Sequence, residues 1–289
     1  MSQPVAFDTA LAAALAGEVG DGAVYTVASR LPPAGRPFTP TAEAALQHEL
    51  PRLAARFAAA ERLVLAIPEC VSPCGVPDLV VVVVTSDERL RGRLTAGVAP
   101  LLWPPDAHLV AALDPQHGCR LEELAATTGL GREETRRRVR VLVCRGAARR
   151  TGDGKLTRHP ALVPLGGLHA LEAKVRNWRR GAAQTAAYQR WADTASLVLA
   201  CPPRDLAALE QRPRDRRLGL ATADAWQRDP VPTTHTPAQR LLASEFIAAA
   251  LLGPQRELRV TPRGRPWAPP HPGQQALFTS GGEVNQCDR

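Results

Sequence analysis

Lysine, methionine and aromatic residues are scarce in this chain of 289 residues. Only two of the 36 basic residues are lysines, Lys155 and Lys174, and aromatic residues make up 4% of the chain. Where arginine is this abundant, a retained lysine indicates a position that needs a compact, freely rotating ammonium. Both lysines are therefore candidate functional residues.

Long apolar runs and a dense set of cysteines are also missing. No stretch approaches the roughly 20 apolar residues that span a bilayer, and no basic segment precedes the first apolar stretch, so we expect a cytoplasmic protein without membrane contact. Six scattered cysteines exclude the disulfide framework of a small secreted domain. Cys70 and Cys74 are close in sequence, but no second pair with zinc-ligand spacing follows. A net charge of +8 favours a polyanionic partner, with nucleic acid ahead of an anionic membrane.

Hydrophobic patterning predicts an α/β (α+β) core with a mixed sheet flanked by helices. Leu46, Leu50, Leu53 and Phe57 recur at helical spacing over residues 41–62, and Pro51 is expected to bend that helix. Strands are predicted at 62–67, 76–85, 168–175, 196–201 and 218–221, and helices at 178–192 and 236–252. The second strand is almost all valine, which is typical of the centre of a sheet covered on both faces.

The segment between the second and third strands differs in character. Helices are predicted at 107–113, 121–128 and 132–144, with a glycine turn before the third and a hairpin over 147–158. This order resembles winged helix-turn-helix domains. We therefore predict four segments: an N-terminal helix and linker (1–40), a core (41–103 and 166–252), an inserted winged helix (104–165) and a flexible tail (253–289).

Charge within the insert favours double-stranded DNA as the partner. Residues 104–160 hold 11 basic and 7 acidic residues, with the arginines concentrated in the third helix and the hairpin. Arg132, Thr135 and Arg136 are predicted to approach base edges, whereas Arg149, Lys155 and Arg158 are predicted to hold phosphates. The alternative is a protein-docking module whose arginines are only solvated.

Asp78, Glu172 and Lys174 form the candidate catalytic constellation. Metal-dependent phosphodiester hydrolysis needs oxygen ligands from two chain segments and a cation or base near the attacking water. Glu172 and Lys174 are two apart on a predicted strand and share a face, and Asp78 joins them if the two strands pair. Two carboxylates would then hold Mg²⁺ or Mn²⁺, with the Ala173 carbonyl and water completing the shell. The alternative is a solvated ion pair of Glu172 with Lys174, and an Asp78 that caps a turn.

The motifs Val76-Pro77-Asp78 and Glu172-Ala173-Lys174, with the helix and strand that follow, resemble the PD-(D/E)xK (restriction-endonuclease-like) nuclease superfamily. The resemblance covers residues 41–103 and 166–222, and the long insertion departs from the family pattern. It implies that Gln184 contacts the scissile phosphate or the lysine, and that Glu69 or Glu49 supplies a further acidic ligand. Arg176 and Arg179 would line the cleft and attract the DNA backbone.

Two functions from different classes follow from these patterns. The first is a metal-dependent endonuclease whose winged helix selects the substrate in defence, mobile-element or repair work. The second is a non-catalytic transcriptional regulator that uses a pseudo-nuclease domain for dimerisation or sensing. The sequence leaves a homodimer open in either case.

Overall fold

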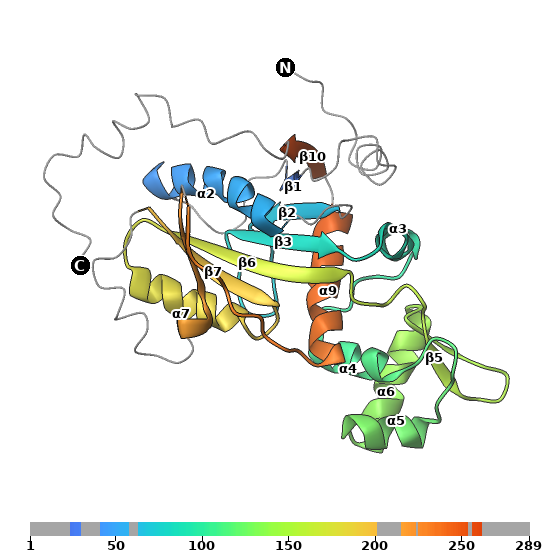
Figure 1. Ribbon diagram of the computed structural model, residues 1–289. Coiled ribbons are helices and arrows are strands. Elements are labelled where there is room, and N and C mark those ends of the chain that lie inside the picture. Colours follow the sequence, from blue (N-terminus) through green and yellow to red (C-terminus); the bar gives the residue numbers. More distant parts are fainter. Residues whose placement is uncertain are drawn as a thin grey trace, which may run out of the picture.

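The valine-rich run forms β3 (Leu79–Val84), and all of its side chains are buried. The computed structural model describes residues 24–29, 41–57, 63–200, 215–223, 225–253 and 256–261. Within these ranges β3 lies inside an 8-stranded mixed sheet with helices on both faces (Figure 1). Because a strand that is apolar on both faces needs cover on both, the placement confirms the predicted mixed sheet flanked by helices.

The strand order across the sheet is β10-β1-β2-β3-β6-β7-β8-β9. Neighbours are antiparallel except for the parallel pairs β1–β2, β6–β7 and β7–β8. The other strands are β1 (Val24–Ser29), β2 (Val64–Pro68), β6 (Gly166–Lys174), β7 (Thr194–Leu199), β8 (Gly219–Thr222), β9 (Trp226–Arg228) and β10 (Arg256–Thr261).

Strands β1 and β10 lie in segments that were predicted to be outside the core, residues 1–40 and 253–289. They pair with each other where the sequence predicted an N-terminal helix with a linker and a flexible tail. The tail prediction is therefore wrong for residues 256–261, because these residues extend the sheet by pairing with a segment far away in the sequence. Residues 1–23, 30–40 and 262–289 lie outside the described residues.

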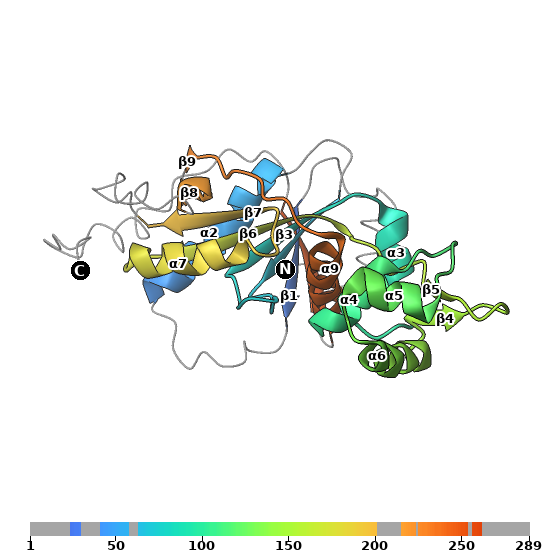
Figure 2. The ribbon, with the colours of Figure 1, turned by 90° about the horizontal axis from the view of Figure 1, so that it is seen from below.

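Helices cover the two faces of the sheet. One face carries α2 (Thr41–Ala54), followed by the 3₁₀ turn Ala55–Phe57, and Pro51 lies inside α2 without ending it. The opposite face carries α7 (Trp178–Tyr188) and α9 (Pro237–Leu252) (Figures 1 and 2). Leu46, Leu50 and Leu53 of α2 pack in one apolar cluster with alternate residues of β3, as their helical spacing predicted. The described part of the chain also holds one further 3₁₀ turn, Asp215–Arg217.

Between β3 and β6 the chain forms a helical unit with its own apolar core. After α3 (Asp87–Thr95) come α4 (Pro104–Ala112), α5 (Leu121–Thr128), α6 (Arg132–Cys144) and the hairpin of β4 (Ala148–Arg150) and β5 (Leu156–Arg158). Leu109, Leu124, Leu142 and Leu156 meet in its core. Leu241 of α9 joins the same core, so α9 connects this unit to the sheet (Figure 2).

Candidate functional site

The pairing of β3 with β6 brings the two predicted motifs together. The strands are antiparallel with Leu79 opposite Leu171, so Asp78, one residue before β3, falls opposite Glu172 near the end of β6. Asp78 and Glu172 are both buried. The expectation that these distant segments lie side by side is therefore met.

Two neutral donors hold the Asp78 carboxylate. The Gln47 side chain on α2 donates from Nε2 to Oδ1 at 2.7 Å, and the Ala173 backbone N–H donates to Oδ2 at 2.7 Å. The sequence reasoning missed Gln47, although an amide beside Leu46 on an otherwise apolar helix face was a usable signal.

Glu172 has no exposed surface and is held by two side chains on the α7 face of the sheet. The Tyr188 hydroxyl donates to Oε2 at 2.9 Å, and the Lys174 ammonium lies 2.8 Å from Oε1. No described donor is aligned for a hydrogen bond to Oε1, so the contact with Lys174 is an ion pair. Burial raises the pKa of Glu172, and the charge of Asp78 raises it further, while Lys174 and Tyr188 act against both.

Lys174 reaches this site through a gap left by a glycine. Its ammonium also donates to the Ala173 carbonyl at 3.0 Å. A Cβ atom on Gly181 of α7 would lie 2.7 Å from the Lys174 Cγ, so only glycine lets the lysine stem pass beneath the helix. Gly181 is a second residue of the candidate site that was not predicted, because an isolated glycine in a helix carries no chemical signature.

Gln184 lies on α7 between Gly181 and Tyr188. Its Oε1 is buried and accepts no hydrogen bond from any residue that the structure describes. Its side chain is half-buried. A buried amide oxygen without a donor is costly unless a donor binds it, so this oxygen is compatible with the predicted contact to the lysine but not with one to a phosphate oxygen.

The acidic residues named as further ligands do not join the pair. Within the described ranges, no three His, Cys, Asp or Glu side chains converge on one point, so Glu69 is not brought together with Asp78 and Glu172. Glu69 sits in a turn with φ of 47°, and its backbone N–H donates to the Asp78 carbonyl at 3.1 Å. Glu49 forms an ion pair with Arg52 at 2.6 Å.

The cationic group after β6 lies on the surface. Arg176 and Arg179 are exposed next to the start of α7. The Arg179 guanidinium lies 5.2 Å from the centre of the Trp178 ring, and Trp178 packs against the main apolar cluster. The tryptophan is therefore a packing residue with a cation on its outer side.

In the helical unit, Thr135 and Arg158 do not lie where they were predicted. Thr135 is fully buried, so its side chain cannot approach base edges. Arg158 is half-buried and donates to the Leu162 carbonyl, and burial lowers its pKa. α6 turns Thr135 into the interior of the unit, and the Arg158 side chain is directed to the Leu162 carbonyl.

The other predicted DNA-contacting residues remain accessible. Arg132 is exposed and Arg136 half-buried, and both are in ion pairs on α6. On the hairpin, Arg149 is exposed and donates to Thr157, and Lys155 is half-buried and pairs with Asp153 at 3.0 Å. The accessible cations lie on the outer face of α6 and on the hairpin.

Comparisons with protein-family models, with curated proteins and with solved structures found no match to this chain. Within the described ranges, every helix is too short or too polar to cross a membrane. The function is therefore inferred from the geometry of the residues themselves.

Proposed function

We propose that this chain is a metal-dependent endonuclease with a restriction-endonuclease-like core and an inserted winged-helix domain that binds double-stranded DNA. One observation carries the proposal. Lys174 forms an ion pair with the buried Glu172 at the end of β6, and Asp78 falls opposite Glu172 on the paired strand, close enough for its charge to raise the pKa of Glu172. Buried charges at such a place need a functional or structural reason, because burying them is costly.

The oxygens present fit Mg²⁺ or Mn²⁺. Asp78, Glu172 and the Ala173 carbonyl would supply hard oxygen ligands from two strands, and water would complete the shell. The Lys174 ammonium already bonds to two of these groups, Glu172 Oε1 and the Ala173 carbonyl, so the oxygens attract a cation. A bound divalent ion would supply Lewis-acid activation of the phosphate and lower the pKa of a water ligand.

The protein's own residues have distinct roles in this proposal. Lys174, as an ammonium, orients the attacking water and stabilises charge that develops on the phosphate. Tyr188 fixes one oxygen of Glu172 and thereby aims the other toward Lys174. Gln47 fixes the orientation of Asp78, and Gln184 offers a free amide oxygen to the lysine or to an attacking water.

The helical unit supports the DNA-binding half of the proposal. The unit consists of three helices followed by a hairpin, and this order resembles a winged helix. Its second helix, α5, ends at Gly129 in the left-handed conformation. The outer face of α6 and the hairpin carry most of its accessible arginines. Such a surface can follow a phosphate backbone, with α6 in the major groove and the hairpin alongside.

Plasmid cleavage tests the enzyme directly. Purified protein is incubated with supercoiled plasmid and Mg²⁺ or Mn²⁺, and Lys174→Ala is compared with Arg89→Ala, which removes an equal charge from the exposed side of α3. We expect cleavage by wild type and by Arg89→Ala, and a loss of about 100-fold or more in Lys174→Ala. Wild-type protein that is folded and binds DNA but cuts with neither metal would refute the enzyme.

Direct metal binding provides a readout that does not depend on activity. Mn²⁺ binding is followed by electron paramagnetic resonance for wild type and Asp78→Asn, which keeps the size of the side chain. We expect binding to weaken by about tenfold or more in the variant, because one of two anionic ligands is lost. Equal binding by both proteins would place the metal elsewhere.

The second candidate function is a DNA-binding regulator without catalysis. The observation that favours it is that all three charged groups already have partners within the protein: Gln47 and Ala173 for Asp78, and Lys174 and Tyr188 for Glu172. Such a cluster can persist as a purely structural one. Tight binding to a specific duplex, with neither nicking nor Mn²⁺ binding, identifies the regulator.

A further inference from the structure

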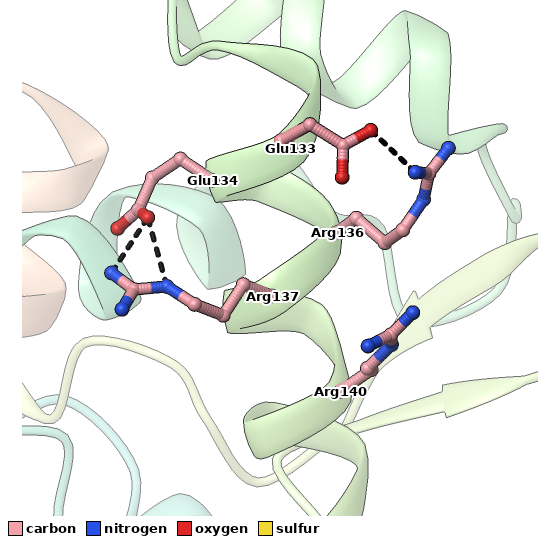
Figure 3. A pocket seen from close by; sticks show the side chains of 5 residues that line it. All are labelled: Glu133, Glu134, Arg136, Arg137 and Arg140. Carbon is pink, nitrogen blue, oxygen red and sulfur yellow. Dashed lines mark hydrogen bonds and ion pairs between the residues drawn. The ribbon is translucent and has the colours of Figure 1, made fainter.

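The outer face of α6 holds a surface hollow of about 330 Å³ that is lined only by charged side chains (Figure 3). The five residues are Glu133, Glu134, Arg136, Arg137 and Arg140. They recur at helical spacing, so they form one side of the helix. The predicted contact surface included Thr135, but Thr135 is buried. The side of α6 that carries the five charged residues is the one accessible to a partner.

Two glutamates in the first turn hold two of these arginines. Glu133 pairs with Arg136, and the Arg137 guanidinium lies 2.7 Å from Glu134 (Figure 3). Glu133 is highly exposed, with 80% of its side chain accessible, so its pair with Arg136 is open to solvent and to competing anions. Burial acts to raise the pKa of Glu134, but the hydrogen bonds and charges of Arg137 and Arg138 together outweigh it and lower the pKa.

The same arrangement holds the remaining arginines in the first half of α6. Arg132 pairs with Glu122 of α5 at 2.8 Å, and Arg138 pairs with Asp106 of α4 at 2.9 Å. Arg140 differs from all of them. Within the ranges that the structure describes, no carboxylate lies within ion-pair distance of Arg140, and Figure 3 shows its side chain apart from both glutamates.

We propose that Glu133 and Glu134 restrain Arg136 and Arg137 and so limit the affinity of α6 for the phosphate backbone of duplex DNA, with Arg140 as the first contact. The inference rests on the proposed DNA-binding function and concerns its regulation. A phosphate that approaches the hollow meets Arg140 at once but must compete with a carboxylate for Arg136. Sequence-independent affinity is therefore lowered, and only a site that adds base contacts compensates for the broken pairs.

The alternative occupant of this face is an acidic protein surface. Duplex DNA is favoured because α6 contacts β4 of the hairpin, and Arg149 and Arg150 on this hairpin strand are exposed. A helix and a hairpin that present cations together suit the groove and the backbone of one duplex.

Binding to random-sequence duplex DNA tests the proposal with Glu133→Gln. Glu133 is preferred over Glu134, since Glu134 also pairs with the half-buried Arg138. Fluorescence anisotropy is measured at several salt concentrations without divalent metal, and the matched control is Glu88→Gln on the exposed side of α3. We expect binding about 1.5- to 5-fold tighter in Glu133→Gln, which is the range set by the strength of exposed ion pairs, and little change in the control.

A double-mutant cycle separates restraint of Arg136 from direct repulsion of phosphate. If Glu133 acts by holding Arg136, the gain from Glu133→Gln disappears in an Arg136→Ala background. A gain that persists without Arg136 would overturn the restraint mechanism. The freed arginine should also make the plot of log affinity against log salt steeper by about 0.9, which corresponds to one additional phosphate contact.

The failure of this inference and the failure of the proposed function are distinguishable. If wild type binds duplex DNA and Arg140→Ala binds it more weakly, the proposed DNA-binding function is supported. This holds whether or not Glu133→Gln binds more tightly. Unchanged affinity in Glu133→Gln overturns only the restraint. Wild type that does not bind duplex DNA even at low salt refutes both and favours a protein partner for α6.

Discussion

A buried ion pair between α3 and α9 is the most stringent test of the fold. Arg93 and Glu245 are 0% and 1% exposed, and they form two parallel contacts of 2.7 Å. Arg93 also donates to the Val98 carbonyl at 3.0 Å, and Glu245 accepts from the Leu101 backbone N–H at 2.9 Å. The pair therefore fixes the segment through which the chain enters the helical unit.

Removing one partner should be strongly destabilising. Arg93→Met keeps the apolar stem but leaves the Glu245 carboxylate buried beside a backbone N–H alone, and such losses cost about 3–5 kcal/mol. At about 2–4 °C per kcal/mol for larger domains, the melting temperature should fall by roughly 6–20 °C. The same change at an exposed pair should cost less than about 1 kcal/mol.

Thermal unfolding followed by circular dichroism checks this magnitude. The control is Arg52→Met, since Arg52 is 54% exposed and pairs with Glu49 on α2. Replacing both buried charges in Arg93→Met with Glu245→Leu should recover much of the loss, because no unpaired charge remains. A loss in Arg93→Met as small as in the control, or a double variant less stable than either single variant, would refute the reasoning.

Three further predictions concern the sheet and the candidate site. Because burial raises the pKa of Glu172, the folded protein holds this proton more tightly than the unfolded chain, and stability falls as pH rises from about 4.5 through the raised value. The stability of Glu172→Gln relative to wild type should thus increase between pH 5 and pH 8 in urea unfolding, and a constant difference would contradict the shift. Burial lowers the pKa of His169 from 6.5 to about 4, so stability should fall as pH drops across that window, by up to roughly 3 kcal/mol, and His169→Gln should flatten this slope. Gly181→Ala places a Cβ 2.7 Å from the Lys174 stem and should reduce DNA cleavage about tenfold or more, whereas Gly92→Ala, with nothing within 4 Å, should cleave normally.

Elements with strong local signals were predicted well. Helices α5 and α6 begin and end at the predicted residues, and α9 begins after Thr236, whose side chain caps it as expected. Glycine turns, capping residues and regular apolar spacing act within a few residues of chain, so they can be recognised from the sequence without knowledge of the fold. The valine strand belongs with them, since its composition already requires a covered sheet.

The polar strand β10 and the buried face of α7 were not predicted. β10 is polar in sequence, and it is a strand because β1, more than 200 residues earlier in the chain, pairs with it. In α7, alanines lie on every side, so apolar spacing alone does not single out the buried face. The buried residues of α7 are Gly181, Ala182, Thr185 and Tyr188, while Ala183 is exposed.

In the candidate site, too, some residues were identified from the sequence and others only from the structure. The sequence alone singled out Asp78, Glu172 and Lys174 as candidate site residues, because charged residues at the ends of apolar strands are conspicuous in one dimension. Only the tertiary structure decided that Gln47 and Tyr188 orient the two carboxylates, that Gly181 makes room for the lysine, and that Glu69 and Thr135 take no part. These roles are set by which surfaces pack together, and packing between segments far apart in the chain leaves no local trace in the sequence.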